Sequence, residues 1–390
     1  MGRGVLCLMS LMFTDNYDTR VFRAPGRVNL IGEHTDYNDG FVMPAAIDFY
    51  TWVKISPLAS RKLHIRSENY GEEVEVDLDD PNIAARGRWS DYPVGVAVML
   101  ERAGYRLHGA RLEIRGEVPI GSGLSSSAAI EVATACALTA TSGLNIDKRE
   151  LALLCRQAEN EFVGARVGIM DQFVSLFGQA HKALMLDCRS LDFKLLPVPD
   201  NVRLIICNTM VKHALASSAY NERRAQCEAG VKHLQGHLPH VKALRDVTLE
   251  QLEQYGRDLP EVVYRRCRHV ITEDERVLSA ANALERHDLN EFGRLMAESH
   301  RSLRDDYEVS STELDVMVEL AQTVEGGVEG VYGARMTGGG FGGCTVNLVA
   351  VEHTEEFRAR VTDGYERAMK LKPEIYVCNA SNGAKEVRPD

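Results

Sequence analysis

The chain has 390 residues, of which 45% are hydrophobic and 26% are charged, and both fractions are typical of soluble globular proteins. No run approaches the roughly 20 apolar residues that a membrane-spanning helix needs, so we expect no membrane span. The formal net charge of −11 argues against a nucleic-acid partner, which normally binds a basic surface. Chains of this length commonly form two domains.

The first half of the chain mixes predicted strands and helices. Val21–Arg23 is predicted as a strand that ends in a turn at Pro25 and Gly26. Alternating apolar and polar residues predict four further strands: Thr51–Ser56, Leu63–Arg66, Glu72–Leu78 and Arg111–Val118.

Two helices follow these strands. Residues Leu124–Thr141 are rich in alanine and carry few charges, which predicts a buried helix. The next helix has a clear start, because Asp147 can act as its N-cap with Glu150 three residues later. Its apolar residues recur at helical spacing: Leu151, Leu154, Cys155, Ala158 and Phe162.

A second domain is predicted to begin near Pro197–Asn201, which gives domains of residues 1–197 and 198–390. A short buried strand is expected at Arg203–Cys207, and helices are expected from about Tyr220 to Thr323. Strands are expected again at Val331–Met336, Cys344–Val351 and Glu374–Cys378. Strict alternation of strands and helices is missing, so the pattern favours an α+β fold.

The cysteines and the N-terminus bear on the cellular compartment. The nine cysteines are widely spaced and form no C-x-x-C pair, so neither a zinc site nor a disulfide framework is predicted. Met1–Phe13 contains a short apolar run after one early charge, as a signal peptide does, but no A-x-A-like cleavage site follows it. We therefore expect a cytoplasmic protein with reduced cysteines.

The segment Pro119–Ala128 lies between a predicted strand and the alanine-rich helix. Gly121 and Gly123 allow the backbone to wrap closely around an anion, and the helix start directs N–H groups at it. The hydroxyls of residues 125–127, all serine, could bind phosphate or a metal ion. The segment lacks the G-K-[ST] of a Walker loop, and an ordinary turn with a serine N-cap is an equally good interpretation.

A second polar segment is Ala24–Tyr37. It crowds charged and polar side chains around apolar ones: Arg27, Glu33, His34 and Asp36 around Val28, Leu30 and Ile31. Carboxylates and imidazole can pair with sugar hydroxyls, which both donate and accept hydrogen bonds. Taken alone, a solvated loop with surface ion pairs is the slightly better interpretation.

Two further segments are candidates for the site. Five of the seven residues 337–343 are glycine, which fits either a close approach of the backbone to a ligand or a tight hairpin. Asp171 stands in an apolar run, where a carboxylate costs stability unless it is paired or catalytic. A helix N-cap at Asp171 is the alternative.

Together these segments resemble the galactokinase branch of the GHMP superfamily of small-molecule kinases. Pro119–Ala128 is similar to the superfamily's phosphate loop, P-x-G-x-G-L-S-S-S-A, and Gly26–Tyr37 is similar to the galactokinase signature. Gly338–Gly343 resembles the third superfamily motif. Three more segments are similar to family stretches: Gly168–Phe173, Ala216–Tyr220 and Ser299–Ser310. The matches follow the family order, roughly from Arg23 to Ala384.

The resemblance implies a two-domain α+β fold with the active site in the cleft between the domains. The N-terminal domain would be similar to domain 2 of ribosomal protein S5, and the C-terminal domain would be ferredoxin-like. The implied reaction transfers the γ-phosphoryl group of Mg-ATP to the C1 hydroxyl of galactose, and a monomer is expected.

The resemblance also implies roles for individual residues. Asp171 would be the general base, and Arg27 would keep it ionised and stabilise charge on the transferring phosphoryl group. Galactose would be bound by Glu33, His34, Thr35, Asp36 and Tyr220. The phosphates would be held by Gly121, Ser122, Gly123, Leu124, Ser125, Ser126 and Ser127. Ser127 and Glu159 would hold Mg²⁺, and Trp89 and Ser90 would border the adenine.

Three alternatives remain open from sequence. The first is a kinase for N-acetylgalactosamine or another sugar with a free C1 hydroxyl. The second is a catalytically inactive sensor of galactose and ATP. The third is a glycine-rich binding protein that binds no sugar.

Overall fold

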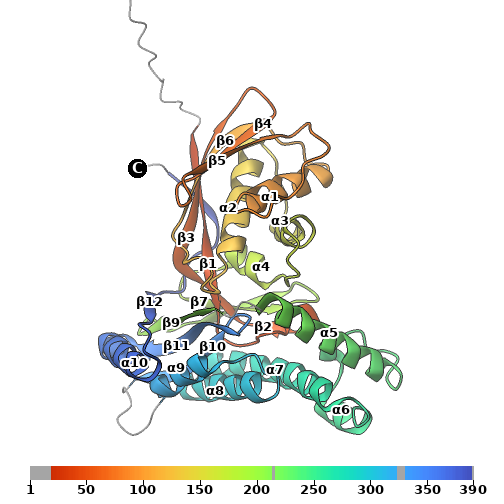
Figure 1. Ribbon diagram of the computed structural model, residues 1–390, viewed down its shortest axis with the longest axis vertical. Helices are drawn as coiled ribbons and strands as arrows, with labels where there is room; N and C mark the ends of the chain where they lie inside the picture. The colour runs from red at the N-terminus through yellow and green to blue at the C-terminus, as the bar shows by residue number, and fades with distance from the viewer. Residues whose placement is uncertain (1–18, 213–215, 323–329, 389–390) are drawn as a thin grey trace, which may run out of the picture.

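The computed structural model describes residues 19–212, 216–322 and 330–388 (Figure 1). Its N-terminal domain is built on a six-stranded sheet in the order β13-β1-β3-β6-β4-β5, in which β4 and β6 are parallel and the other neighbours antiparallel. The strands are β1 (Arg20–Asn29), β3 (Pro44–Pro57), β4 (Lys62–Ser67), β5 (Glu72–Asp77), β6 (Ala110–Gly116) and β13 (Lys385–Val387).

Four helices cover one face of this sheet (Figure 1). They are α1 (Asp91–Arg102), α2 (Ser126–Thr141), α3 (Lys148–Gln157) and α4 (Met170–Phe177). Helix α2 is apolar on nearly all sides, because it packs against β1 and β3 on one side and against the other three helices on the other. The predicted burial of this helix is therefore confirmed.

The C-terminal domain is built on a four-stranded antiparallel sheet in the order β10-β11-β9-β12. Its strands are β9 (Val202–Lys212), β10 (Val331–Thr337), β11 (Gly342–Ala350) and β12 (Glu374–Cys378). Its helices are α5 (Ala216–Gln235), α6 (Leu249–Tyr255), α7 (Glu261–Glu285), α8 (Leu289–Asp305), α9 (Thr312–Gln322) and α10 (Thr354–Met369).

The two domains share an apolar core. A small sheet of β2 (Phe41–Val42), β7 (Lys182–Asp187) and β8 (Phe193–Pro197) lies near the junction. One buried cluster joins residues of the first domain, such as Leu30 and Met43, to residues of the second, such as Val277 and Phe292. The loops between these elements are therefore held in fixed positions relative to each other.

The predicted two-domain α+β architecture is confirmed, and the boundary between residues 197 and 198 stays a prediction. The end of the chain returns to the first domain, because β13 pairs with β1 and Ala380 forms a bridge with Ile47. Within the described ranges no disulfide joins the eight cysteines, and no helix there is long and apolar enough to span a membrane.

The predicted turn at Pro25 and Gly26 is wrong. Strand β1 continues through it, and its pairing with β3 shifts register between Pro25 and Arg27. Glycine is required at this bulge, because a Cβ on Gly26 would lie 2.6 Å from the carbonyl oxygen of Leu124. The bulge brings β1 against the segment before α2.

The helix predicted from Asp147 is confirmed at its start, because the Asp147 side chain accepts hydrogen bonds from the N–H groups of Arg149 and Glu150. Its end differs from a regular α-helix. Residues Ala158–Val163 form a π-helical turn, which contains Glu159. Such turns are frequent at functional sites, since the wider turn redirects side chains.

Candidate active site

Segments from both domains line one small polar cavity of about 140 Å³. We call the β1–β2 connection, residues 30–40, the signature loop, and residues 119–125 the phosphate loop. The cavity is lined by Arg27, Glu33, His34, Asp36, Val167, Gly168, Met170, Asp171, Tyr220, Gly338 and Gly339. The structure thus brings six of the predicted site residues to one place, from β1, the signature loop, α4 and α5.

A larger hollow of about 620 Å³ is lined in part by the phosphate loop. We call it the aromatic pocket, because Tyr70, Trp89 and Tyr92 line it together with Gly121, Ser126 and Ser127. The rings of Tyr70 and Trp89 are stacked, with centroids 5.8 Å apart and an interplanar angle of 8°.

Arg27 and Asp171 form a bidentate ion pair on the wall of the polar cavity. Arg27 Nε donates to Asp171 Oδ1 and Arg27 Nη2 donates to Asp171 Oδ2, both at 2.7 Å. Arg27 Nη1 donates to the Gly123 carbonyl at 2.6 Å, and the Arg27 backbone N–H donates to the Leu124 carbonyl at 3.1 Å. Asp171 also accepts from the Ser125 hydroxyl. One charge pair therefore fixes β1, α4 and the phosphate loop together.

The start of α2 is open toward the aromatic pocket. Its N-cap, Ser125, has φ 58° and makes no capping hydrogen bond with its side chain, because the hydroxyl is bonded to Asp171. Ser126 and Ser127, in the first helical turn, line the aromatic pocket. An uncapped helix start with free N–H groups is a binding site for anions such as phosphate.

Two side chains of the phosphate loop point into the protein. Ser122 is 1% exposed and its hydroxyl donates to the Pro119 carbonyl at 2.7 Å. Leu124 is buried in the core shared by the two domains. For these two residues, any contribution to phosphate binding would come from the backbone.

Behind the phosphate loop, the side-chain amide of Gln172 bridges two glutamates. Gln172 Nε2 donates to Glu159 Oε2 at 2.7 Å and to Glu131 Oε2 at 3.0 Å, and all three side chains are buried. Burial, and then the negative charge of Asp171, raises the pKa of Glu159 to about 7, although hydrogen bonds from Ser127 and Gln172 oppose this. Burial, and then the charge of Glu159, raises the pKa of Glu131 well above its usual range.

Glu159 was predicted from the sequence as a site residue, but Gln172 and Glu131 were not. A signal was present, because Glu131 is the one charged residue in the sequence of α2. A charge in an apolar helix must be paired or functional. The π-helical turn that directs Glu159 toward Gln172 had no such signal.

The carboxylate of Glu33 joins the signature loop to the C-terminal domain. It is 3% exposed and lies on the cavity wall. It accepts hydrogen bonds from Arg335 Nη1 at 3.1 Å, Thr337 Oγ1 at 3.0 Å, the Gly338 N–H at 2.7 Å, and Asn29 Nδ2. Glu33 therefore has a structural role whether or not it also contacts a ligand.

Asp36 lies directly against the segment before α4. A Cβ on Gly168 would be 1.8 Å from Asp36 Oδ2, so only glycine fits at position 168. Burial, and then the charge of Asp171, raises the pKa of Asp36 to about 6. The two carboxyl groups face the same small cavity.

Thr35 does not line the cavity. It is fully buried, and its hydroxyl lies within hydrogen-bond distance of the carbonyls of Gly32, at 2.9 Å, and Phe41, at 2.6 Å. This geometry gives no support to the expected sugar contact of Thr35, whose side chain stabilises the signature loop. On the opposite wall, the ring of Tyr220 lies 5.4 Å from that of His34.

Three buried polar side chains of α7 hold the signature loop from the C-terminal domain: His269, Glu273 and Asp274. His269 Nε2 donates to the Glu33 carbonyl at 3.1 Å, and Glu273 accepts from the Gly32 N–H at 3.0 Å. Asp274 accepts from the Phe41 N–H at 2.7 Å. None of the three was predicted from the sequence, because no local pattern pairs α7 with a loop more than 200 residues away.

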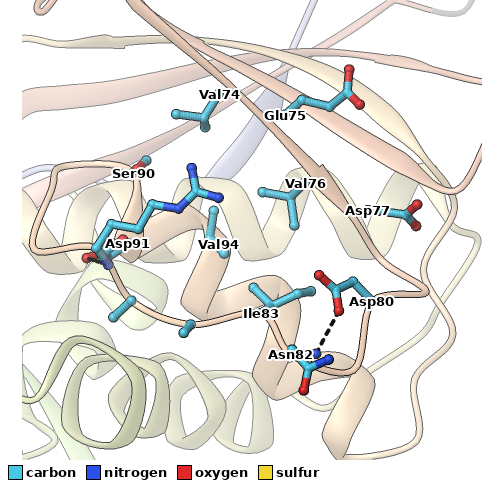
Figure 2. A pocket seen from close by; sticks show the side chains of 13 residues that line it. Val74, Glu75, Val76, Asp77, Asp80, Asn82, Ile83, Ser90, Asp91 and Val94 are labelled. Carbon is cyan, nitrogen blue, oxygen red and sulfur yellow. Dashed lines mark hydrogen bonds between the residues drawn. The ribbon is translucent and has the colours of Figure 1, made fainter.

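A separate hollow of about 260 Å³ lies beside the edge strand β5 (Figure 2). Its wall includes Val74, Asp80, Ile83 and Ser90, so Ser90 faces this hollow and Trp89 alone of that pair lines the aromatic pocket. Asp91, at its rim, accepts three backbone N–H groups and so stabilises the local turn. None of the three glycine-rich or polar motifs reaches this hollow.

Three sequence models of protein families match the chain. Residues 91–179 match the N-terminal domain of GHMP kinases, and residues 280–366 match the C-terminal domain of GHMP kinases. Residues 12–57 match the galactokinase galactose-binding signature.

Curated relatives match over nearly the whole length. The galactokinase of Roseiflexus sp. (strain RS-1) is 47% identical over 367 residues, which cover 94% of this chain and 93% of the relative. The galactokinase of Chloroflexus aggregans (strain MD-66 / DSM 9485) is 47% identical over 365 residues, with the same coverage.

The fold is similar to that of solved structures. The crystal structure of Lactococcus lactis galactokinase complexed with galactose matches with a TM-score of 0.91 and 38% identity, covering 96% of this chain and 97% of that one. A mevalonate kinase structure, at 18% identity and a TM-score of 0.66, shares the fold.

The burial of Asp274 predicts a pH-dependent stability. Burial raises the pKa of Asp274 to about 7, so the folded state binds its proton more tightly than the unfolded state. The free energy of unfolding should therefore fall as pH rises from about 4 to about 7. We expect Asp274→Asn to stabilise the protein relative to wild type at pH 8, and this advantage to shrink by ~2 kcal/mol at pH 5.5, as measured by urea unfolding.

Asp246 provides a control of opposite sign. The bidentate hydrogen bonds of Arg189 hold the pKa of Asp246 below its usual range. Asp246→Asn should therefore lose stability at pH 8. If the difference in free energy of unfolding between Asp274→Asn and wild type is the same at pH 8 and pH 5.5, the pKa of Asp274 is not raised by burial.

Proposed function

This chain belongs to the galactokinase family of the GHMP kinases, and from that membership we propose that it transfers the γ-phosphoryl group of ATP to the C1 hydroxyl of galactose. The products are galactose 1-phosphate and ADP. The observation that carries the proposal is the Arg27–Asp171 ion pair, which lies where the polar cavity meets the phosphate loop. A hydroxyl in the cavity and a phosphoryl group on the loop would meet at this pair.

We propose Asp171 as the general base. An ionised carboxylate has about four lone-pair sites, and Arg27 and Ser125 use three of those on Asp171. One site is left to accept the proton of a sugar hydroxyl as its oxygen attacks the phosphorus. Arg27 uses three of its five N–H donors in the bonds described above, so two remain for the negative charge that develops on the transferring group.

The sugar would be oriented by the polar groups of the cavity. Asp36 and His34 would bind its hydroxyls, and the ring of Tyr220 would pack on the opposite side. The four acceptor sites of Glu33 are taken by donors of the protein, so Glu33 would act by holding the signature loop in place. The match of residues 12–57 to the galactokinase galactose-binding signature favours galactose over its larger N-acetyl derivative. The complete Arg27–Asp171–Ser125 arrangement favours an active kinase over an inactive sensor.

ATP would extend from the phosphate loop into the aromatic pocket. The open N–H groups at the start of α2 suit its phosphates, and Tyr70, Trp89 and Tyr92 offer apolar and aromatic surface to the base. A monomeric state and a cytoplasmic location stay predictions from the sequence.

We propose Ser127 and Glu159 as ligands of the Mg²⁺ that accompanies ATP. The fit is electrostatic, because burial and the charge of Asp171 raise the pKa of Glu159 to about 7, and a divalent cation would favour its ionised form. Hydroxyl and carboxylate oxygens suit Mg²⁺, which takes few protein ligands and keeps phosphate oxygens and water. Bound there, the ion would neutralise charge on the phosphates.

The substrate proposal predicts sugar-dependent ADP release. With Mg-ATP, we expect rapid release with galactose and little release with N-acetylgalactosamine, with glucose or without sugar. Galactose alone should also raise the melting temperature, because it binds the folded state. A higher melting temperature without ADP release would place the chain among sensors, and a preference for another sugar would overturn the assignment to galactose.

The assignment of the base predicts the effect of Asp171→Asn. The amide cannot accept the proton, so we expect kcat to fall about 10²- to 10⁴-fold. Galactose binding, measured by isothermal titration calorimetry, should be retained within about fivefold, since a neutral hydrogen bond contributes roughly 1 kcal/mol. Asp79→Asn is the control, because Asp79 pairs with Arg61 on the surface. Turnover near wild type in Asp171→Asn would exclude Asp171 as the base.

The bridge made by Gln172 predicts a selective defect in metal binding. Gln172→Met keeps the volume but removes the amide that orients Glu159, so Mg²⁺ should strengthen ADP binding about 10-fold less than in wild type. Calorimetric titrations of ADP with and without Mg²⁺ measure this, and binding of ADP alone should not change. Gln157→Met is the control, because Gln157 is exposed and bonds Glu161 on the surface. Equal strengthening by Mg²⁺ in both variants would show that Gln172 does not orient a metal ligand.

A further inference from the structure

A continuous chain of side-chain hydrogen bonds leads from the C-terminal domain to His34 on the cavity wall. Tyr307 Oη lies 3.2 Å from Cys227 Sγ and 2.8 Å from Tyr37 Oη, and Tyr37 Oη lies 2.8 Å from His34 Nδ1. Tyr307 and Cys227 are at most 1% exposed, and His34 is 5% exposed. These groups come from α5, from the segment after α8, and from the signature loop.

The imidazole of His34 is neutral at physiological pH. Burial, and then the electrostatic interaction with His269, lowers the pKa of His34 to about 3. A neutral imidazole has one N–H donor and one acceptor nitrogen, and the hydrogen bond at one nitrogen decides the role of the other. The Tyr37 hydroxyl occupies Nδ1.

The other nitrogen, Nε2, is buried and makes no regular hydrogen bond with the residues described. The backbone of Gly339, across the cavity, acts to raise the pKa of the ring, as a carbonyl beside a ring N–H does. This favours a proton on Nε2 and an acceptor at Nδ1. The hydroxyls then point one way, with Tyr307 donating to Tyr37 and Tyr37 donating to His34.

We propose that the chain from Cys227 through Tyr307 and Tyr37 fixes the His34 tautomer with its proton on Nε2, so that the cavity presents a permanent hydrogen-bond donor to one hydroxyl oxygen of the sugar. The inference rests on the proposed function and deepens it. Tyr37 and Tyr307 are positioning residues, because they act on the sugar through His34. A sugar that lacks the hydroxyl facing His34 would leave this buried donor unpaired, which is a strong basis for specificity.

The surroundings hold the His34 ring in place. Its centroid lies 4.8 Å from that of Tyr307 and 5.4 Å from that of Tyr220, with tilted rings on both contacts. The backbone of His34 has φ 65°, a conformation that non-glycine residues adopt at some cost in energy. Its carbonyl accepts from Asn38 Nδ2 at 2.9 Å, which fixes that backbone.

The tautomer can be measured in the wild-type protein, and a variant is needed only to assign the signals. In protein labelled with ¹⁵N-histidine, two-bond ¹H–¹⁵N spectra distinguish Nε2–H from Nδ1–H rings. The spectrum of His34→Gln identifies the His34 signals among the 12 histidines. We expect the Nε2–H pattern for His34 at pH 7.5, and an Nδ1–H or protonated pattern would overturn the proposal. This result does not depend on catalysis, so it stands apart from a failure of the proposed function.

Variants test the link to the sugar. Tyr37→Phe and Tyr307→Phe should each raise the KM for galactose about 5- to 20-fold while the KM for ATP stays unchanged, and the double variant should lose little more, because the groups act as one chain. The His34 signals of Tyr37→Phe should move toward a mixture of tautomers. Tyr365→Phe is the control, because it removes another buried hydroxyl, which donates to the Thr209 carbonyl.

Deoxy sugars identify the sugar hydroxyl that accepts the hydrogen bond from His34. With 2-, 3-, 4- and 6-deoxygalactose, wild type should lose most affinity at one position, and Tyr37→Phe should lose at least fivefold less at that same position. If wild type and Tyr37→Phe lose the same affinity, relative to galactose, for every deoxy sugar, the hydrogen-bond chain from Cys227 to His34 has no part in specificity and the proposal is wrong.

Discussion

The site depends on the buried carboxylate of Glu33. It belongs to the signature loop of the first domain, and three of its four hydrogen-bond donors belong to β10 and the glycine-rich turn of the second. The pair it forms with Arg335 is almost completely removed from water, so loss of either partner would leave a buried charge uncompensated. Because this link holds the signature loop against Gly338, the two domains present their cavity-lining groups at fixed separations. The buried apolar cluster that the two domains share has the same effect on a larger scale.

Around this fixed frame the site concentrates negative charge. Burial raises the pKa of Asp36 to about 6 and of Glu159 to about 7, and in both cases the charge of Asp171 is the second cause. The ion pair of Arg27 with Asp171 compensates one carboxylate directly. The free-energy cost of burying the carboxylates of Asp36 and Glu159 is understandable in a kinase. A divalent cation beside Glu159 and sugar hydroxyls on Asp36 would stabilise their ionised forms. The free site is thus prepared for ligands whose chemistry complements it.

The sequence predicted what local rules control and missed what distant contacts control. The Asp147 cap and the apolar spacing after it are local, and the helix begins as expected. The Pro25–Gly26 turn was wrong because pairing with β3 carries the strand through a bulge that local turn preference does not anticipate. Motif order placed Arg27, His34, Asp36 and Asp171 together, but spacing could not reveal that Thr35 points inward or that α7 supports the loop. Those features depend on contacts between residues more than 200 positions apart or on a side-chain rotation that composition does not encode.

Each of the three motifs contains a residue other than glycine in a strained backbone conformation. His34, Ser125 and Phe341 have φ values of 65°, 58° and 57°. Each is held by a contact that reaches another segment. His34 is linked through Tyr37 to Tyr307, and Ser125 is bonded to Asp171. The backbone N–H of Phe341 donates a hydrogen bond to the Val309 carbonyl at 2.7 Å. Strain of this kind persists only where surrounding contacts over-determine the conformation. The signature loop, the phosphate loop and the glycine-rich turn are therefore each held by contacts to other segments, which favours binding two substrates in a reactive orientation without reorganisation.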